Sequence, residues 1–169
     1  MAIKVGDRLP EGTLSEYFDT EAPGCSVGPN SFSVSELSKG KRIVIFGLPG
    51  AFTPTCSAKH VPGYVSARDR LRAKGVDEVW CISVNDPFVM GAWGRDQKTV
   101  GKVRMMADGS ATDTRAVGLD MDLTARGMGV RSQRYSMFVD NGIVKALHVE
   151  QPGKFEVSDA ETMLREIGR

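Results

Sequence analysis

Histidine and paired cysteine are scarce in this chain, and their scarcity excludes several kinds of chemistry. The 169 residues contain three cysteines and two histidines: Cys25, Cys56, Cys81, His60 and His148. Three cysteines are too few for a disulfide scaffold, and the absence of a Cys-x-x-Cys pair argues against a dithiol reductase of the thioredoxin kind. With no cysteines at ligand spacing we expect no metal site. Neither a P-loop nor a Gly-x-Gly-x-x-Gly fingerprint occurs, so we expect no cofactor.

An excess of charge of one sign and long apolar runs are also missing. The 22 Lys and Arg and the 21 Asp and Glu residues nearly cancel, and no basic block occurs, which argues against a nucleic-acid partner. No apolar run is long enough to span a membrane, and the N-terminus lacks the apolar segment of a signal peptide. We therefore expect a cytoplasmic protein without a membrane partner, folded as a single domain over residues 1–169.

Strand-like and helix-like segments alternate along the chain. Apolar, β-branched runs predict strands at 41–47, 79–84, 103–107, 135–139 and 143–149. Capping patterns predict helices at 33–37, at 56–74 with a kink or break at Pro62-Gly63, after Asp86, at 112–117, and after a Ser158–Glu161 capping box. Gly75 is the expected C-cap of the second helix, and Asp140-Asn141-Gly142 predicts a hairpin. This order indicates an α/β sandwich with a mixed central sheet.

Cys56 lies where a Pro- and Gly-rich loop runs into a helix. Thr53 is a favoured N-cap and Pro54 suits the first helical position, which places Cys56 in the first turn. Free backbone N–H groups and the helix dipole stabilise an anion there. A thiol in that place should lose its proton more readily, and the thiolate is the nucleophilic form. The pattern indicates a chemical site.

The string Gly-Leu-Pro-Gly-Ala-Phe-Thr-Pro-Thr-Cys, residues 47–56, contains Pro49-x-x-x-Thr53-x-x-Cys56. It resembles the peroxidatic motif of the peroxiredoxins, and the fuller string resembles their peroxiredoxin-5-like, type II branch. The likeness extends over residues 74–90 and 134–144, and so covers most of residues 40–150. It implies a thioredoxin-like fold and a thiol peroxidase.

Residue by residue, the resemblance implies that Cys56 attacks a peroxide and becomes a sulfenic acid. Arg134 would stabilise the thiolate and the charge on the leaving oxygen. The Thr53 hydroxyl would hydrogen-bond the peroxide or the thiolate, and Pro49 would shield the sulfur from water. A homodimer is also implied by the branch.

Each of these residues has a plainer alternative. Cys56 alone would more often be a buried, inert thiol, and Thr53 a helix cap only. Arg134 is alternatively a surface arginine, as are Arg126 and Arg131. Pro49 is alternatively a turn former, and for His60, one helical turn after Cys56, an ordinary packed or solvated histidine is the favoured interpretation.

The sequence leaves open how the sulfenic acid is reduced. Residues 151–158, where some members of the branch carry a second cysteine, contain none. Cys81 matches a position proposed for the resolving cysteine of plant type II enzymes, yet it lies in an apolar strand; Cys25 lies in a flexible-looking loop. The favoured hypothesis is recycling by an external thiol, either glutathione with glutaredoxin or thioredoxin. The main alternative is a redox sensor or chaperone switched by oxidation of Cys56.

Overall fold

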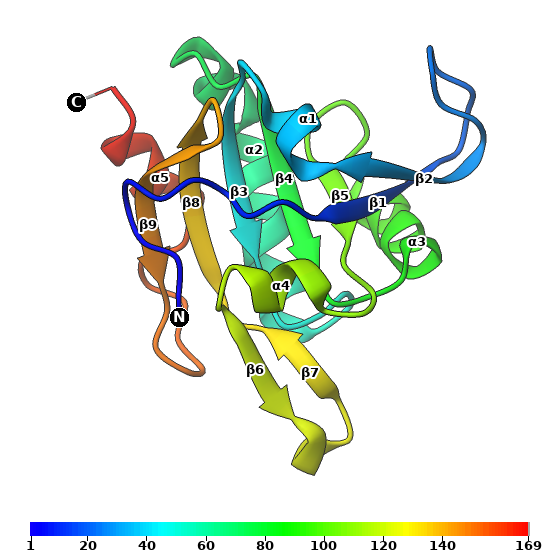
Figure 1. Ribbon diagram of the computed structural model, residues 1–169, viewed down its shortest axis with the longest axis vertical. Helices are drawn as coiled ribbons and strands as arrows, with labels where there is room; N and C mark the ends of the chain where they lie inside the picture. The colour runs from blue at the N-terminus through cyan, green and yellow to red at the C-terminus, as the bar shows by residue number, and fades with distance from the viewer. Residues whose placement is uncertain (169) are drawn as a thin grey trace.

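The computed structural model describes residues 1–168, so Arg169, the last residue of the expected domain, lies outside the described residues. A seven-stranded sheet runs through the molecule in the order β2-β1-β5-β4-β3-β8-β9 (Figure 1). Its strands are β1 (Thr13–Phe18), β2 (Gly28–Ser33), β3 (Arg42–Gly47), β4 (Glu78–Ser83), β5 (Arg104–Ala107), β8 (Tyr135–Asp140) and β9 (Ile143–Val149). Strands β3, β4 and β5 run parallel and the others pair antiparallel, which confirms the predicted mixed sheet.

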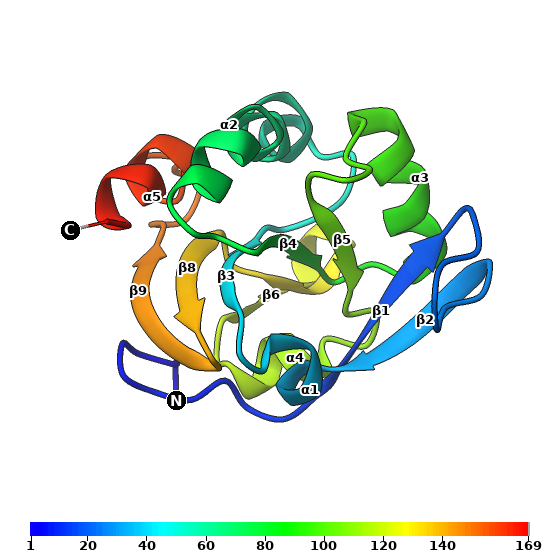
Figure 2. The same ribbon diagram turned by 90° about the horizontal axis from the view of Figure 1, so that it is seen from above.

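Helices cover both faces of the sheet (Figure 2). They are α1 (Val34–Ser38), α2 (Val61–Ala73), α3 (Pro87–Gln97), α4 (Thr112–Ala116) and α5 (Ala160–Glu166), with a π-helical turn η1 (Cys56–His60) before α2 and a 3-10 turn η2 (Thr124–Arg126). In Figure 2 α2, α3 and α5 lie on one side of the sheet, and α1 and α4 on the other. Within residues 1–168, no helix has the length and apolar character needed to cross a membrane.

Strand β3 is apolar on both faces because it lies inside this layered structure. Val44 and Phe46 belong to the core cluster that contains α2 and α5 side chains, whereas Ile43 and Ile45 belong to the cluster on the opposite face. Successive side chains of a strand alternate between faces, so a strand buried on both sides needs an unbroken apolar run. The unbroken apolar run that predicted β3 therefore reflects the central position of this strand in the sheet. The loop that carries the predicted site follows β3 directly, after Gly47.

Most predicted elements are confirmed, and one predicted cap is corrected. Gly75 ends α2 in a left-handed conformation with φ +88°. Asp86 caps α3 by accepting a hydrogen bond from the Val89 N–H at 2.9 Å. The Ser158–Glu161 capping box is wrong, because Asp159 caps α5 by accepting from Thr162 and Ser158 is turned toward a different partner.

A projecting hairpin of β6 (Asp120–Leu123) and β7 (Gly129–Ser132) was not predicted; Figure 1 shows it as an extension away from the sheet. Its strands are short and carry few β-branched residues, so they show little strand periodicity.

Gly47, at the end of β3, is required by close packing. A Cβ added there would lie 2.2 Å from a ring carbon of Tyr135, its partner across the β3–β8 ladder. We expect Gly47→Ala to lower the free energy of unfolding by about 1–3 kcal/mol, since the ring must shift within a filled core. Denaturant unfolding measures this loss.

Gly63→Ala is the matched control for that substitution. A Cβ at Gly63 meets nothing within 4 Å, and the residue lies inside α2. Alanine there should leave the stability unchanged or raise it by up to about 1 kcal/mol. Equal effects of the two substitutions would contradict the role given to the Gly47–Tyr135 contact.

Candidate active site

The loop after β3 enters a helix where the sequence predicted. The helical turns begin at Pro54, and the Ser57 N–H donates to the Thr53 carbonyl at 2.9 Å. The Thr53 hydroxyl, however, donates to the Gly50 carbonyl at 2.7 Å and so closes the loop instead of receiving a helix N–H. With its hydrogen used in this way, the hydroxyl can act toward a substrate only as an acceptor. It does not donate to Cys56 in this conformation.

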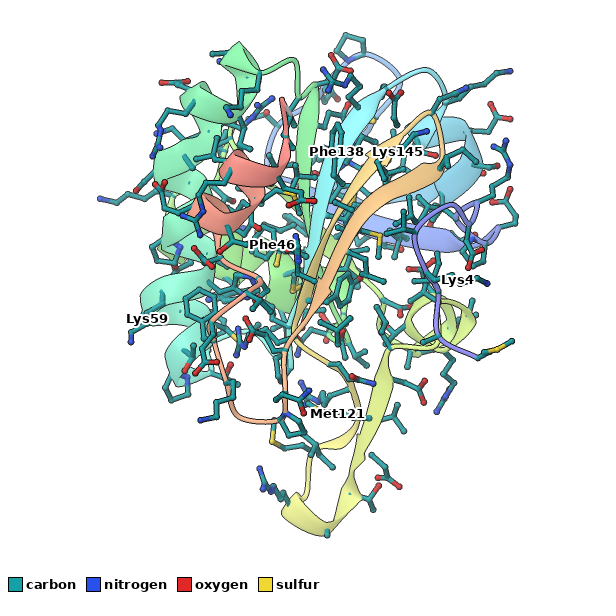
Figure 3. The ribbon with its side chains drawn as sticks, turned by 90° about the vertical axis from the view of Figure 1, so that its left-hand side faces the viewer. Lys4, Phe46, Lys59, Met121, Phe138 and Lys145 are labelled. Carbon is teal, nitrogen blue, oxygen red and sulfur yellow. The ribbon has the colours of Figure 1, made fainter. Side chains whose placement is uncertain are left out.

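Cys56 begins the π-helical turn η1, which replaces the predicted kink. The Val61 N–H donates to the Cys56 carbonyl five residues earlier, so the turn widens just before Pro62, which has no N–H to donate. Cys56 and His60 are both buried, whereas Lys59 points to solvent. Figure 3 shows Lys59 on the outer side of the helical layer and Phe46 between that layer and the sheet. The first helical turn thus directs the Cys56 and His60 side chains inward.

Arg134 reaches the cysteine from a distant segment. It immediately precedes β8, which pairs with β3, and its Nη2 lies 3.2 Å from Cys56 Sγ. The guanidinium also lies 5.8 Å from the centre of the Phe155 ring. A fixed positive charge beside a buried sulfur stabilises its anionic form. The sheet pairing therefore brings together the two residues on which the predicted chemistry depends most.

His60 also takes part in this cluster, which the sequence analysis did not favour. Its Nδ1 lies 2.9 Å from Arg134 Nη1, and its ring packs 4.8 Å from that of Phe46 and 5.0 Å from that of Phe155. Burial, and secondly the charge of Arg134, lowers the pKa of His60 to about 3, so the imidazole is neutral at neutral pH. Its spacing of four residues from Cys56 was the one signal in the sequence that could have indicated this role.

Contacts from neighbouring elements hold the loop between β3 and η1. Asn85 Oδ1 accepts from the Ala51 N–H at 3.0 Å, and Trp93 Nε1 donates to Ser57 Oγ at 3.0 Å. Arg131 Nη1 donates to the Pro49 carbonyl at 3.4 Å, so this arginine is not a free surface residue. Pro49 is half-buried at the edge of this loop.

A cavity of about 360 Å³ opens beside Arg134. Its lining includes Pro49, Thr55, Met121, Arg134 and Glu150. Arg134 belongs both to this lining and to the contact with Cys56, whereas Cys56 itself is buried and does not line the cavity. Figure 3 shows Met121 at the end of the molecule where the β6–β7 hairpin extends. A larger cavity, of about 600 Å³, is lined by residues of β1, α3 and β5 and includes neither Cys56 nor Arg134.

The other two cysteines are placed differently. Cys81 is fully buried in the middle of β4 and belongs to the same core cluster as Cys56. Burial, and secondly the nearby Cys56, raises the pKa of the Cys81 thiol well above its ordinary value, so it is a thiol at neutral pH. Cys25 is half-buried in the turn before β2, and all three cysteines are free. Among residues 1–168, no group of three or more metal-ligating side chains is gathered to hold an ion.

Comparison with known proteins gives a consistent result. The Redoxin family model matches residues 4–164. Peroxiredoxin-2D of Arabidopsis thaliana is 45% identical over 165 residues, covering 98% of each chain. Reduced Prx3 from Vibrio vulnificus, solved with hydrogen peroxide, is 48% identical with a TM-score of 0.89, covering 98% of this chain and 99% of its own. A Burkholderia cenocepacia protein provisionally named a thioredoxin reductase is 63% identical with a TM-score of 0.99, covering 100% of both chains.

Proposed function

Because this chain belongs to the type II branch of the peroxiredoxins and is a thiol-dependent peroxidase, we propose that Cys56 is the residue that its peroxide substrate oxidises. The observation that carries this assignment is the 3.2 Å contact between Cys56 Sγ and Arg134 Nη2. Neither of the other cysteines is paired with a cation in this way in the part of the chain that the structure describes. The proposed substrates are hydrogen peroxide and small alkyl hydroperoxides.

The chemistry follows from the charges at the site. The Cys56 thiolate attacks one peroxide oxygen, forming an S–O bond as the O–O bond breaks. The attacked oxygen keeps its hydrogen, so the sulfur is oxidised to a sulfenic acid, while the leaving oxygen departs with the bonding pair and takes a proton from solvent to become water or an alcohol. Arg134 offers N–H donors to the charge that moves from sulfur to oxygen. Thr53 accepts a hydrogen bond from the peroxide O–H, and Pro49 limits the access of water.

We also propose that an external thiol recycles the sulfenic acid. The incoming thiol forms a mixed disulfide with Cys56 and releases water. A second thiol then attacks the donor sulfur of this mixed disulfide, which releases the Cys56 thiolate and joins the two donor sulfurs in a disulfide. Glutathione with glutaredoxin, or thioredoxin, would supply these thiols. The raised pKa of the Cys81 thiol supports this route over an internal disulfide, because the thiol that resolves a sulfenic acid reacts as a thiolate.

Peroxide consumption under each reducing system tests this route. We expect Cys81→Ser and Cys25→Ser to turn over at the parent rate with the external donor, and mass spectrometry to find a mixed disulfide on Cys56. A Cys56–Cys81 or Cys56–Cys25 disulfide in peroxide-treated protein, together with loss of turnover in the matching serine variant, would contradict external recycling. Slow oxidation without turnover under either donor would favour the redox-sensor alternative.

The name of the Burkholderia protein suggests a different activity, thiol–disulfide reduction. This chain has neither a Cys-x-x-Cys pair nor a dinucleotide-binding fingerprint, so it lacks the groups on which such a reaction depends. The homodimer and the cytoplasmic location stay predictions, since relatives of the chain include proteins named chloroplastic and mitochondrial.

A further inference from the structure

His60 is held between two polar groups behind the Cys56–Arg134 contact. Arg134 Nη1 lies 2.9 Å from His60 Nδ1, and His60 Nε2 lies 3.1 Å from the carbonyl oxygen of Ser158. A guanidinium carries only donors, and a carbonyl oxygen can only accept. His60 must therefore accept at Nδ1 and donate from Nε2. This arrangement selects the neutral tautomer with its hydrogen on Nε2.

The surroundings maintain that tautomer. A protonated imidazole would place an N–H against the guanidinium of Arg134, and burial already disfavours the charged ring. The Tyr64 hydroxyl donates to the same Ser158 carbonyl at 2.9 Å, which fixes the oxygen from a second direction.

Glu150 fixes the turn that carries this carbonyl. Its Oε2 accepts from the Ser158 N–H at 2.8 Å and from the Ser158 hydroxyl at 2.7 Å, and the N–H groups of Glu156 and Val157 donate to the same carboxylate. Burial raises the pKa of Glu150, but these hydrogen bonds outweigh it and hold the pKa below its usual range. The Glu150 N–H also donates to the Arg134 carbonyl at 2.9 Å. The turn is thus tied to the arginine that it helps to place.

We infer that His60 is a positioning residue for the peroxidase reaction: its Nδ1 holds the Arg134 guanidinium against Cys56, while the Ser158 carbonyl keeps that nitrogen aimed at the arginine. Arg134 is a long side chain with several rotamers, and an acceptor at one end of its fork removes that freedom. Glu150 contributes one step further out, through Ser158. The inference rests on the roles proposed for Cys56 and Arg134.

Two substitutions separate the two nitrogens of His60. Asparagine places its side-chain oxygen near the position of Nδ1 and keeps the acceptor for Arg134. Glutamine places its amide nitrogen near Nε2 and keeps the donor to Ser158. Both remove the ring and its packing against Phe46 and Phe155. We expect His60→Gln to lower the second-order rate constant for oxidation of Cys56 by hydrogen peroxide about tenfold or more, and His60→Asn to recover most of that loss.

The ultraviolet absorbance of the Cys56 thiolate gives a second readout. We expect this absorbance to be highest in the parent protein, lower in His60→Asn and lowest in His60→Gln. Lys59→Gln is the control, because Lys59 lies on the same helical turn as His60 but points to solvent. This variant should be oxidised at the parent rate.

Equal oxidation rates for His60→Asn and His60→Gln, whether slow or parent-like, would overturn the inference while leaving the roles of Cys56 and Arg134 intact. A parent-like rate in Cys56→Ser would instead overturn the proposed function, and this inference with it.

Discussion

Replacing Cys56 with serine is expected to reduce peroxide consumption to the uncatalysed background. A serine hydroxyl stays protonated at neutral pH even beside Arg134, so no anionic nucleophile is left to attack the O–O bond. Consumption of hydrogen peroxide in the presence of thioredoxin, and separately of glutathione with glutaredoxin, measures the loss.

Cys81→Ser and Cys25→Ser are the matched controls for this substitution, since each removes one thiol and leaves the Cys56–Arg134 contact intact. The unfolding free energy of Cys56→Ser should change by about 1 kcal/mol or less, because Arg134 can donate to the serine oxygen as it does to the sulfur. Activity that survives in Cys56→Ser but disappears in one of the controls would show that the wrong cysteine had been assigned.

Replacing Arg134 with methionine is expected to have the second-largest effect. The guanidinium is the cation that contacts the sulfur, and it stands at the wall of the adjoining cavity. Removing a donor aimed at developing charge typically slows a reaction about 10²- to 10³-fold. Stopped-flow measurement of Cys56 oxidation by hydrogen peroxide gives the rate constant directly. Arg134→Lys should be intermediate, because an ammonium keeps the charge but cannot contact Cys56 and His60 through one planar fork.

Arg126→Met provides the comparison for Arg134. Arg126 lies exposed in the η2 turn of the projecting hairpin, so its loss removes the same charge from the chain without touching the cluster. It should be oxidised at the parent rate. A similar slowing in both variants would mean that the overall charge of the protein, and not the contact at Cys56, governs the reaction.

Local interactions made part of this structure predictable. The Thr53-Pro54 pair predicts a helix start that places Cys56 in the first turn, and the Asp86-Pro87 pair predicts a cap at Asp86; both starts depend on residues adjacent in the sequence. The buried strands followed from apolar runs that only a sheet covered on both faces requires. The resemblance of residues 47–56 to the peroxidatic motif then implied that Arg134 stabilises the thiolate.

Other features depend on contacts between segments far apart in the chain. The sequence predicts Ser158 as a helix cap, but its hydroxyl donates to the Glu150 carboxylate. Asp159 caps the helix instead. The resemblance implies that the Thr53 hydroxyl bonds the peroxide or the thiolate, and the plainer alternative is a helix cap; in the folded loop it donates to the Gly50 carbonyl. A residue with several candidate partners takes the one that the fold brings within hydrogen-bonding distance, and no local rule ranks these partners.

The sequence by itself determined the place of Cys56 at the start of a helix and the resemblance to the family, because these depend on residues close together in one short string. Only the tertiary structure decided that Arg134 meets the sulfur and that His60 and Glu150 stand behind that arginine. The pairing of β3 with β8 and the return of residues 150–158 close those distances. A hydrogen bond exists only where the two groups lie about 3 Å apart, and that separation is set by the packing of the whole chain.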